Sequence, residues 1–106
     1  MIPLPDSVQV GAHTYTIELV NEAMMRSWTD NEPGHVDHKN QIIRLNDKLP
    51  HTGRITVLIH EILHIVSHAF SNGQLDEDVV DRISEGFGQA LLSLGADFQF
   101  PDEELE

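Results

Sequence analysis

Three histidines recur at four-residue spacing in the largely apolar segment TVLIHEILHIVSH. They are His60, His64 and His68, and Glu61 directly follows the first of them. On a helix, residues four positions apart lie one turn apart on the same face, so His60 and His64 can reach one metal ion. Polar side chains buried without partners cost free energy, and a bound metal ion removes that cost. The segment therefore favours a metal site over the alternative, histidines with ordinary partners in a core.

The pentapeptide HEILH fits the pattern H-E-x-x-H, in which the histidines bind zinc and the glutamate acts as a general base. Zinc accepts neutral imidazole nitrogens and, in catalytic sites, keeps one coordination position for water. Glu61 lies about 100° around the helix from His60, where it can stand beside that water without binding the metal. The pattern predicts one Zn²⁺ ion held by His60 and His64, with Glu61 as the catalytic base.

The third ligand must come from outside this segment. A continuous helix rises about 12 Å between His60 and His68, too far for both side chains to bind one ion. Sites that use a later histidine place a glycine after the second histidine so that the chain can turn back. Ile65, Val66 and Ser67 stand there instead. We therefore expect His68 to border the site or to bond a neighbouring side chain.

Two glutamates of the next predicted helix, Glu77 and Glu85, are the candidates for this ligand. At about 100° per residue, Glu85 points away from the apolar stripe of that helix, whereas Glu77 lies at its edge, beside Ser84 and Gly88. Glu77 is therefore the preferred ligand, with the alternative that it is only a first-turn carboxylate favoured by the helix dipole. Asp81, one turn beyond Glu77, could accept the second ring N–H of a ligating histidine.

Alternating apolar residues in the first half of the chain predict strands that would support this helix. Residues 8–10 and 14–20 flank the turn GAH as a predicted hairpin, and residues 40–46 form a third strand. Within that strand, residues 41–45 are a candidate edge for pairing with a peptide backbone. Residues 21–34 are ambiguous, because NEAMMRSW could form a short helical turn before NEPG ends it.

Helical periodicity begins after DKLP, with Thr52 as the expected N-cap of an apolar stretch from Ile55 to Phe70 and Gly73 near its end. This helix is apolar around most of its circumference, which is typical of a central, buried helix. A last helix is predicted from about 76 to 94. Its apolar stripe, expected to face the core, consists of Val80, Ile83, Phe87, Ala90, Leu91 and Leu94.

The order of strands, helix and helix predicts an α+β fold, a small and mainly antiparallel sheet covered by two helices. The chain of 106 residues suffices for one domain, expected over residues 1–99. The acidic end, residues 100–106 with the sequence FPDEELE, is expected to be a disordered tail.

Charge and composition narrow the functional classes. Eighteen acidic against six basic residues give a net charge of −12, which disfavours nucleic acid and anionic lipid as partners. The absence of cysteine excludes disulfides and thiolate metal sites, and is compatible with a cytoplasmic location. The start of the sequence, MIPLPDSVQV, has no basic region and no long apolar core, so we expect no signal peptide, and no apolar run approaches the ~20 residues of a membrane span.

The metal motif and the following helix resemble a known group of peptidases. HEILH followed after twelve residues by EDVVDRISEGF is similar to the gluzincin arrangement, in which a glutamate on the next helix completes the metal site. More narrowly, residues 34–94 resemble small phage and prophage metallopeptidases related to the ImmA/IrrE family. The stretch GHVDHKNQIIRLNDKLP resembles the segment that precedes their active-site helix. Their second motif, E-x-x-A-N-x-F-A, is matched loosely, with valine and aspartate where alanine and asparagine are usual, by Glu77, Val80, Asp81, Ile83 and Ser84.

The resemblance implies a minimal zincin-like fold and zinc-dependent hydrolysis of peptide bonds, with Glu77 as ligand and Asp81 as the acid behind a ligand. It implies a peptide or protein substrate, which in some members is a repressor-like regulator, and the host cytoplasm as location if a phage encodes the chain. The oligomeric state stays open. The side chain that stabilises the oxyanion also stays open among Tyr15, His35, His38, His68 and Arg82.

Two other classes of function remain as alternatives. A zinc-stabilised protein-interaction module with little or no peptidase activity would use the same ligands, but it would not need Glu61, and it would tend to fill the fourth metal position with a side chain. An acidic mimic of nucleic acid would need carboxylates along one face and no metal.

Overall fold

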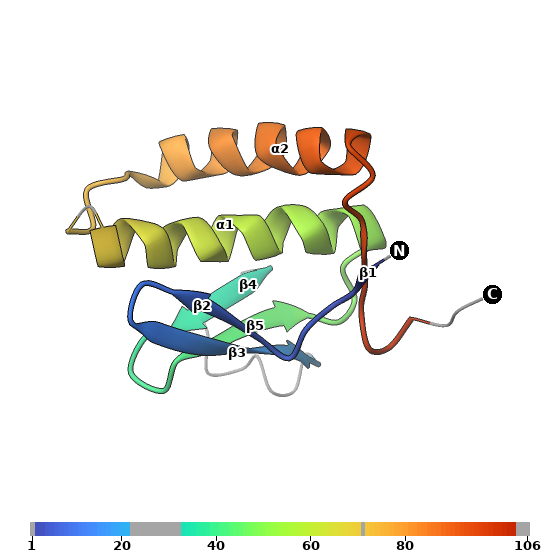
Figure 1. The fold of residues 1–106 in the computed structure, drawn as a ribbon, viewed down its shortest axis with the longest axis horizontal. Coiled ribbons are helices and arrows are strands. Elements are labelled where there is room, and N and C mark those ends of the chain that lie inside the picture. Colours follow the sequence, from blue (N-terminus) through green and yellow to red (C-terminus); the bar gives the residue numbers. More distant parts are fainter. Residues whose placement is uncertain (1, 22–32, 71, 104–106) are drawn as a thin grey trace.

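The computed structural model describes residues 2–21, 33–70 and 72–103. The two helices and the sheet form layers, with the first helix between the second helix and the sheet (Figure 1). The α+β fold predicted from the sequence is therefore confirmed. The helical turn considered within residues 21–34 falls almost entirely outside the described residues. The elements are β1 (Ile2–Pro3), β2 (Ser7–Val10), β3 (His13–Val20), β4 (Gly34–Asp37), β5 (Ile42–Asn46), α1 (His51–Phe70), α2 (Glu77–Ser93) and β6 (Phe98–Gln99).

The main sheet has four strands in the order β2-β3-β5-β4. The predicted hairpin of β2 and β3 is antiparallel, as is the β4–β5 pair, but β3 and β5 run parallel, so the sheet is mixed. The prediction that residues 41–45 offer a free edge is wrong. Both sides of β5 are hydrogen-bonded, to β3 and to β4, and among the described strands β4 ends the sheet.

Helix α1 begins at His51, where the carbonyl of Pro50 accepts the backbone N–H of Arg54 at 3.0 Å. Thr52 is therefore inside the first turn, and its assignment as the N-cap is wrong. The helix ends near Gly73 as predicted, because Gly73 has φ 73° and its N–H reaches back to the carbonyl of Ser67 at 2.9 Å. Between these ends the helix packs against both the sheet and α2, and its buried apolar side chains belong to the main core. Among the described residues, no helix is long and apolar enough to cross a membrane.

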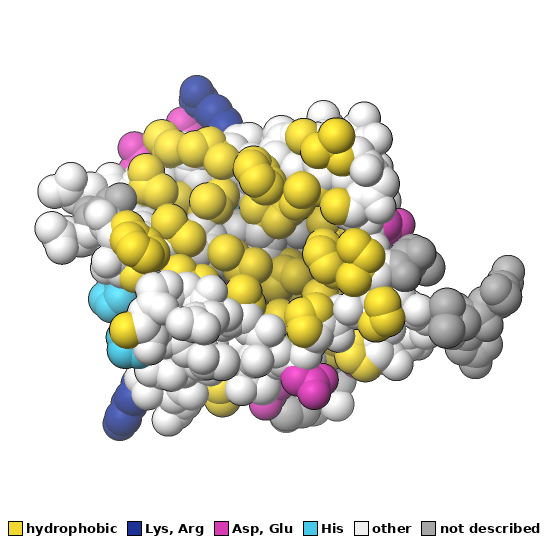
Figure 2. Space-filling view, in the orientation of Figure 1, with side chains coloured by type: hydrophobic (Ala, Val, Ile, Leu, Met, Phe, Trp, Pro, Cys, Tyr) yellow, Lys and Arg dark blue, Asp and Glu magenta, His cyan; other side chains and the backbone are white. Residues whose placement is uncertain are grey.

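Helix α2 turns a different face to α1 than its apolar stripe predicts. Its buried residues are Val80, Ser84 and Gly88, whereas Phe87 is 55% exposed and Leu94 is 82% exposed. The small side chains let α2 approach α1 closely, and this rotates the helix so that much of the stripe faces solvent. The exposed stripe adds to a broad hydrophobic surface that spans the helices (Figure 2).

The prediction of a disordered tail over residues 100–106 is wrong for residues 100–103. Phe100 is 1% exposed and belongs to the hydrophobic core, and the guanidinium of Arg54 lies 5.3 Å from the centre of its ring. Arg54 also pairs with Asp102, and the Glu103 carboxylate lies 2.6 Å from His51 Nδ1. The chain therefore stays packed against the start of α1 through residue 103, and the acidic residues hold it there.

Candidate metal centre

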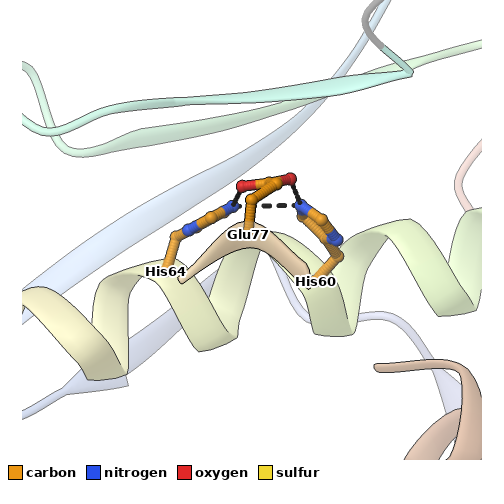
Figure 3. Close-up of side chains that lie close together, drawn as sticks. All are labelled: His60, His64 and Glu77. Atoms are coloured by element: carbon orange, nitrogen blue, oxygen red, sulfur yellow. Dashed lines mark hydrogen bonds and ion pairs between the residues drawn. The ribbon is translucent and has the colours of Figure 1, made fainter. Parts of the chain in front are cut away.

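The histidines of the H-E-x-x-H motif project from one side of α1 and converge (Figure 3). Their Nε2 atoms lie 3.0 Å apart. Both side chains are partly covered, with His60 16% and His64 29% exposed. One helical turn separates the two residues, and this spacing alone brings the rings to a common point.

Helix α2 begins where it can add a carboxylate to this pair. Asp76 caps the helix by accepting the backbone N–H of Val79 at 2.9 Å, which fixes Glu77 in the first turn. The Glu77 oxygens lie 2.9 Å from His60 Nε2 and 3.0 Å from His64 Nε2 (Figure 3). Sequence reasoning preferred Glu77 over Glu85 and His68, and the structure brings Glu77 to the two histidines.

The donor atoms of these three residues fit a zinc ion. Two imidazole nitrogens and one carboxylate oxygen form the N₂O set of one class of catalytic zinc site. Zinc bonds of ~2.0 Å in a tetrahedron place ligand atoms about 3.3 Å apart, a few tenths of an ångström more than the separations of 2.9–3.0 Å found here. All the candidate ligand atoms lie within 4.8 Å of one another. The three side chains can therefore hold one ion and leave its fourth position open.

Asp81 lies behind the first histidine. Its Oδ1 is 3.0 Å from His60 Nδ1, on the ring nitrogen that faces away from Glu77. An acceptor there keeps the proton on Nδ1 and leaves the Nε2 lone pair for a metal. The sequence suggested that Asp81 could lie next to a candidate ligand, and in the structure it lies next to His60.

Glu61 is buried beside the same group, with 6% of its surface exposed. It lines one cavity together with His60, His64 and Glu77. The backbone of β4 passes close by at Gly34, where a Cβ atom would lie 2.6 Å from Val57 Cγ1 and 3.1 Å from Glu61 Oε2. Sequence reasoning missed Gly34, because no local pattern shows that a strand passes so close to the helix.

The cavity has a volume of about 400 Å³ and opens between three elements. Helix α1 forms its floor, the edge strand β4 with Pro33 forms one wall, and α2 forms the other. The lining residues are Pro33, Gly34, His35, Val36, Thr56, Val57, His60, Glu61, His64, Glu77, Asp81, Ser84 and Glu85.

Three of the candidate oxyanion residues gather at one end of α1 instead. The hydroxyl of Tyr15 lies 3.1 Å from His38 Nδ1, and the rings of His38 and His68 are 4.6 Å apart. Burial, followed by the nearby His68 and His64, lowers the pKa of His38, and burial raises the pKa of Tyr15. None of these three side chains lines the metal cavity. His68 thus lies apart from the candidate ligands, with its ring against that of His38.

The other two candidates, Arg82 and His35, are also poorly positioned to stabilise an oxyanion at the metal group. Arg82 is exposed and pairs with Asp78 on the outer side of α2 at 2.7 Å. His35 lines the cavity, but it stands opposite Arg44 in the β4–β5 register, whereas its neighbour Gly34 faces α1. Because side chains alternate along a strand, we expect the His35 side chain on the face of β4 opposite to the one that Gly34 turns to α1.

Comparison with known families gives one match. Residues 12–106 match the Peptidase_M78 family, described as the IrrE N-terminal-like domain. No curated protein and no solved structure matches the chain.

Proposed function

The chain belongs to the Peptidase_M78 family, and from this premise we propose that it is a zinc-dependent metallopeptidase. In this proposal His60, His64 and Glu77 bind one Zn²⁺ ion per chain, and Glu61 is the general base. The observation that carries the proposal is the convergence of these three donor side chains beside a buried glutamate. A binding site alone does not require Glu61, whereas hydrolysis does.

The reaction follows from the position of each side chain. Zinc, when bound, supplies a water of pKa ~7 and polarises the carbonyl of the scissile bond. Glu61 accepts a proton from the attacking water and donates it to the leaving amine. Glu61 is buried beside Gly34 of β4, at the base of the cavity. Asp81 holds the His60 ring in the orientation that points Nε2 toward the ion.

The substrate in this proposal is an extended peptide or an unfolded segment of a protein, and a regulator protein is one such partner. The edge strand β4 replaces residues 41–45 as the surface for backbone pairing, because β4 borders both the open side of the sheet and the cavity. A strand laid along β4 would cross the floor of the cavity at His60 and His64. The open shape of the cavity is compatible with such a chain passing through it.

A zinc-stabilised protein-interaction module is the second candidate. The exposed hydrophobic surface on the helices, which includes Ile83, Phe87 and Leu94, favours this function. The same ligands would then hold the ion for stability only. The metal group offers three ligands and no fourth side chain among the described residues, an arrangement more typical of catalytic than of structural zinc.

Zinc content and peptide cleavage of four variants test the proposal. We expect one zinc per wild-type chain, loss of zinc in His60→Ala, reduced zinc in Glu77→Ala, and full zinc without cleavage in Glu61→Gln. Asp78→Asn is the matched control for Glu77, because Asp78 shares the first turn of α2 but pairs with Arg82. If Asp78→Asn and Glu77→Ala lower the zinc content equally, Glu77 only stabilises the first turn of α2 and does not bind the ion.

The outcome also separates the two candidate functions. Cleavage by wild type that disappears in Glu61→Gln supports the peptidase. Full zinc occupancy with no cleavage of any peptide or unfolded protein supports the interaction module. If Glu61→Gln loses zinc while Glu77→Ala keeps it, the assigned roles of the two glutamates are wrong.

A further inference from the structure

One carboxylate in the metal cavity is used by none of the steps above. Glu85 lines the cavity and is exposed. Among the described residues, no hydrogen bond or ion pair engages its side chain. Glu77 and Asp81 are paired with imidazoles and Glu61 is buried at the base of the site, so Glu85 is the carboxylate left for something that enters the cavity.

The contacts of α2 with α1 fix the position of Glu85 along the cavity. Asp81 meets His60, and a Cβ atom on Gly88 would lie 3.4 Å from Thr56 Oγ1, so the two helices run antiparallel. Glu85 falls between these contacts, one turn beyond Asp81, or about 5.4 Å further from the metal group. It therefore marks the end of the cavity formed by Thr56 and Pro33, opposite the end that leads to His68.

The charge of the cavity favours a cation at this end. Its lining contains the carboxylates Glu61, Glu77, Asp81 and Glu85 and no lysine or arginine. A bound dication offsets only half of their charge, and the whole chain carries −12. A cleft lined by one sign of charge concentrates ligands of the other sign.

We propose that Glu85 makes the cavity select peptides that carry lysine or arginine on the side of the scissile bond that lies over Thr56. This inference rests on the proposed peptidase function and names its substrate class. Residues of an extended peptide advance about 3.3 Å each, so a side chain one or two positions from the scissile bond reaches Glu85. Charge attraction at an exposed carboxylate is modest, and we expect a preference on the order of 5-fold in kcat/KM for lysine over glutamine.

The test uses zinc-loaded protein and peptide sets that differ only in lysine, glutamine or glutamate at one position at a time. For wild type we expect kcat/KM in the order lysine, glutamine, glutamate at one position on one side of the cleaved bond. Glu85→Gln should abolish the order and Glu85→Lys should reverse it. Asp78→Asn is the control, since it removes one negative charge from the same helix outside the cavity and should keep the wild-type order.

Peptide binding to Glu61→Gln, with and without Glu85→Gln, supplies a readout that does not need cleavage. Cleavage with no charge preference, or a preference that Glu85→Gln leaves intact, overturns the role of Glu85 while the peptidase stands. Lysine-selective binding that depends on Glu85, without cleavage by wild type, supports Glu85 and contradicts the peptidase. If the protein neither binds nor cleaves any peptide, both the role of Glu85 and the peptidase function are wrong.

Discussion

At the scale of single residues, the wall of the candidate centre depends on a residue without a side chain. Gly34 lets the edge strand lie against α1 at Val57 and beside the Glu61 carboxylate. Any Cβ there would push on Val57 at a separation that real Cβ atoms do not tolerate. Either Val57 or the strand would have to shift, and the packing beside Glu61 would change with it.

We therefore predict that Gly34→Ala lowers both stability and activity. Overpacking of this kind costs about 1–3 kcal/mol, measurable as a lower free energy of unfolding in urea. If the protein is the proposed peptidase, cleavage should fall further than zinc content, because the wall at Glu61 shifts while the proposed zinc ligands stay on the helices. Gly86→Ala is the control: a Cβ there meets nothing within 4 Å, and removing a mid-helix glycine should stabilise by roughly 0.5–1 kcal/mol. Unchanged stability in Gly34→Ala would contradict the close contact.

The same scale shows how far local sequence patterns predict the site. His60, Glu61 and His64 lie on one helix, so 3.6-residue periodicity alone relates them. Glu77 needed a further argument about which side of the next helix faces the first. The part played by Gly34 depends on a strand brought in from a distant segment, and no spacing within the sequence encodes it.

At the scale of elements, helix α2 packs through its small residues rather than through its largest apolar ones. Ser84 is 1% exposed and Val80 is 0% exposed, while Ile83 is 42% exposed. An apolar stripe indicates only a preference for burial, whereas close approach of two helices depends on side-chain size. The sequence predicted the pairing of β2 with β3, which a short turn joins. It did not predict the parallel pairing of β3 with β5, because these strands come from distant segments.

This orientation of α2 can be tested by truncating two residues of the predicted stripe, one that the structure buries and one that it exposes. Val80→Ala removes a fully buried side chain and should lower the free energy of unfolding by about 2 kcal/mol. Leu94→Ala removes a side chain that is 82% exposed, and the change should stay within about 0.5 kcal/mol. If Leu94→Ala costs as much as Val80→Ala, the stripe is buried in solution.

At the scale of the whole molecule, the two ends of the chain are joined beside the start of α1. Strands β1 and β6 pair in parallel, with Ile2 opposite Phe98, and Phe100 follows into the core. The acidic composition of residues 100–106 predicted disorder. The prediction failed for residues 100–103 because composition does not show which basic side chains the carboxylates will contact. His51 and Arg54 are those cations, and both lie in the first turn of α1.

The pairing of His51 makes this junction sensitive to pH. Its ring lies between Asp97, 2.7 Å from Nε2, and Glu103, 2.6 Å from Nδ1, and these bonds raise the pKa of His51 above 6.5. Because the folded-state pKa is the higher one, the stabilisation is complete below pH 6.5 and is lost as pH rises through the folded-state pKa. The pKa of Asp102 is lowered by Arg54, so its contribution is present above its usual pKa and is lost in acid.

We predict that His51→Gln destabilises the protein by on the order of 1 kcal/mol near pH 5.5, where His51 is charged in both the folded and unfolded states. The difference from wild type should shrink as pH rises through the folded-state pKa of His51, because the wild-type histidine then loses its proton. Urea unfolding of both proteins across this range measures the difference directly. His13→Gln is the control, since the His13 ring bonds the uncharged side chain of Gln41 and no carboxylate among the described residues, and its difference from wild type should not follow this course. If the loss of unfolding free energy in His51→Gln grows with pH, the carboxylates do not bind a charged imidazole.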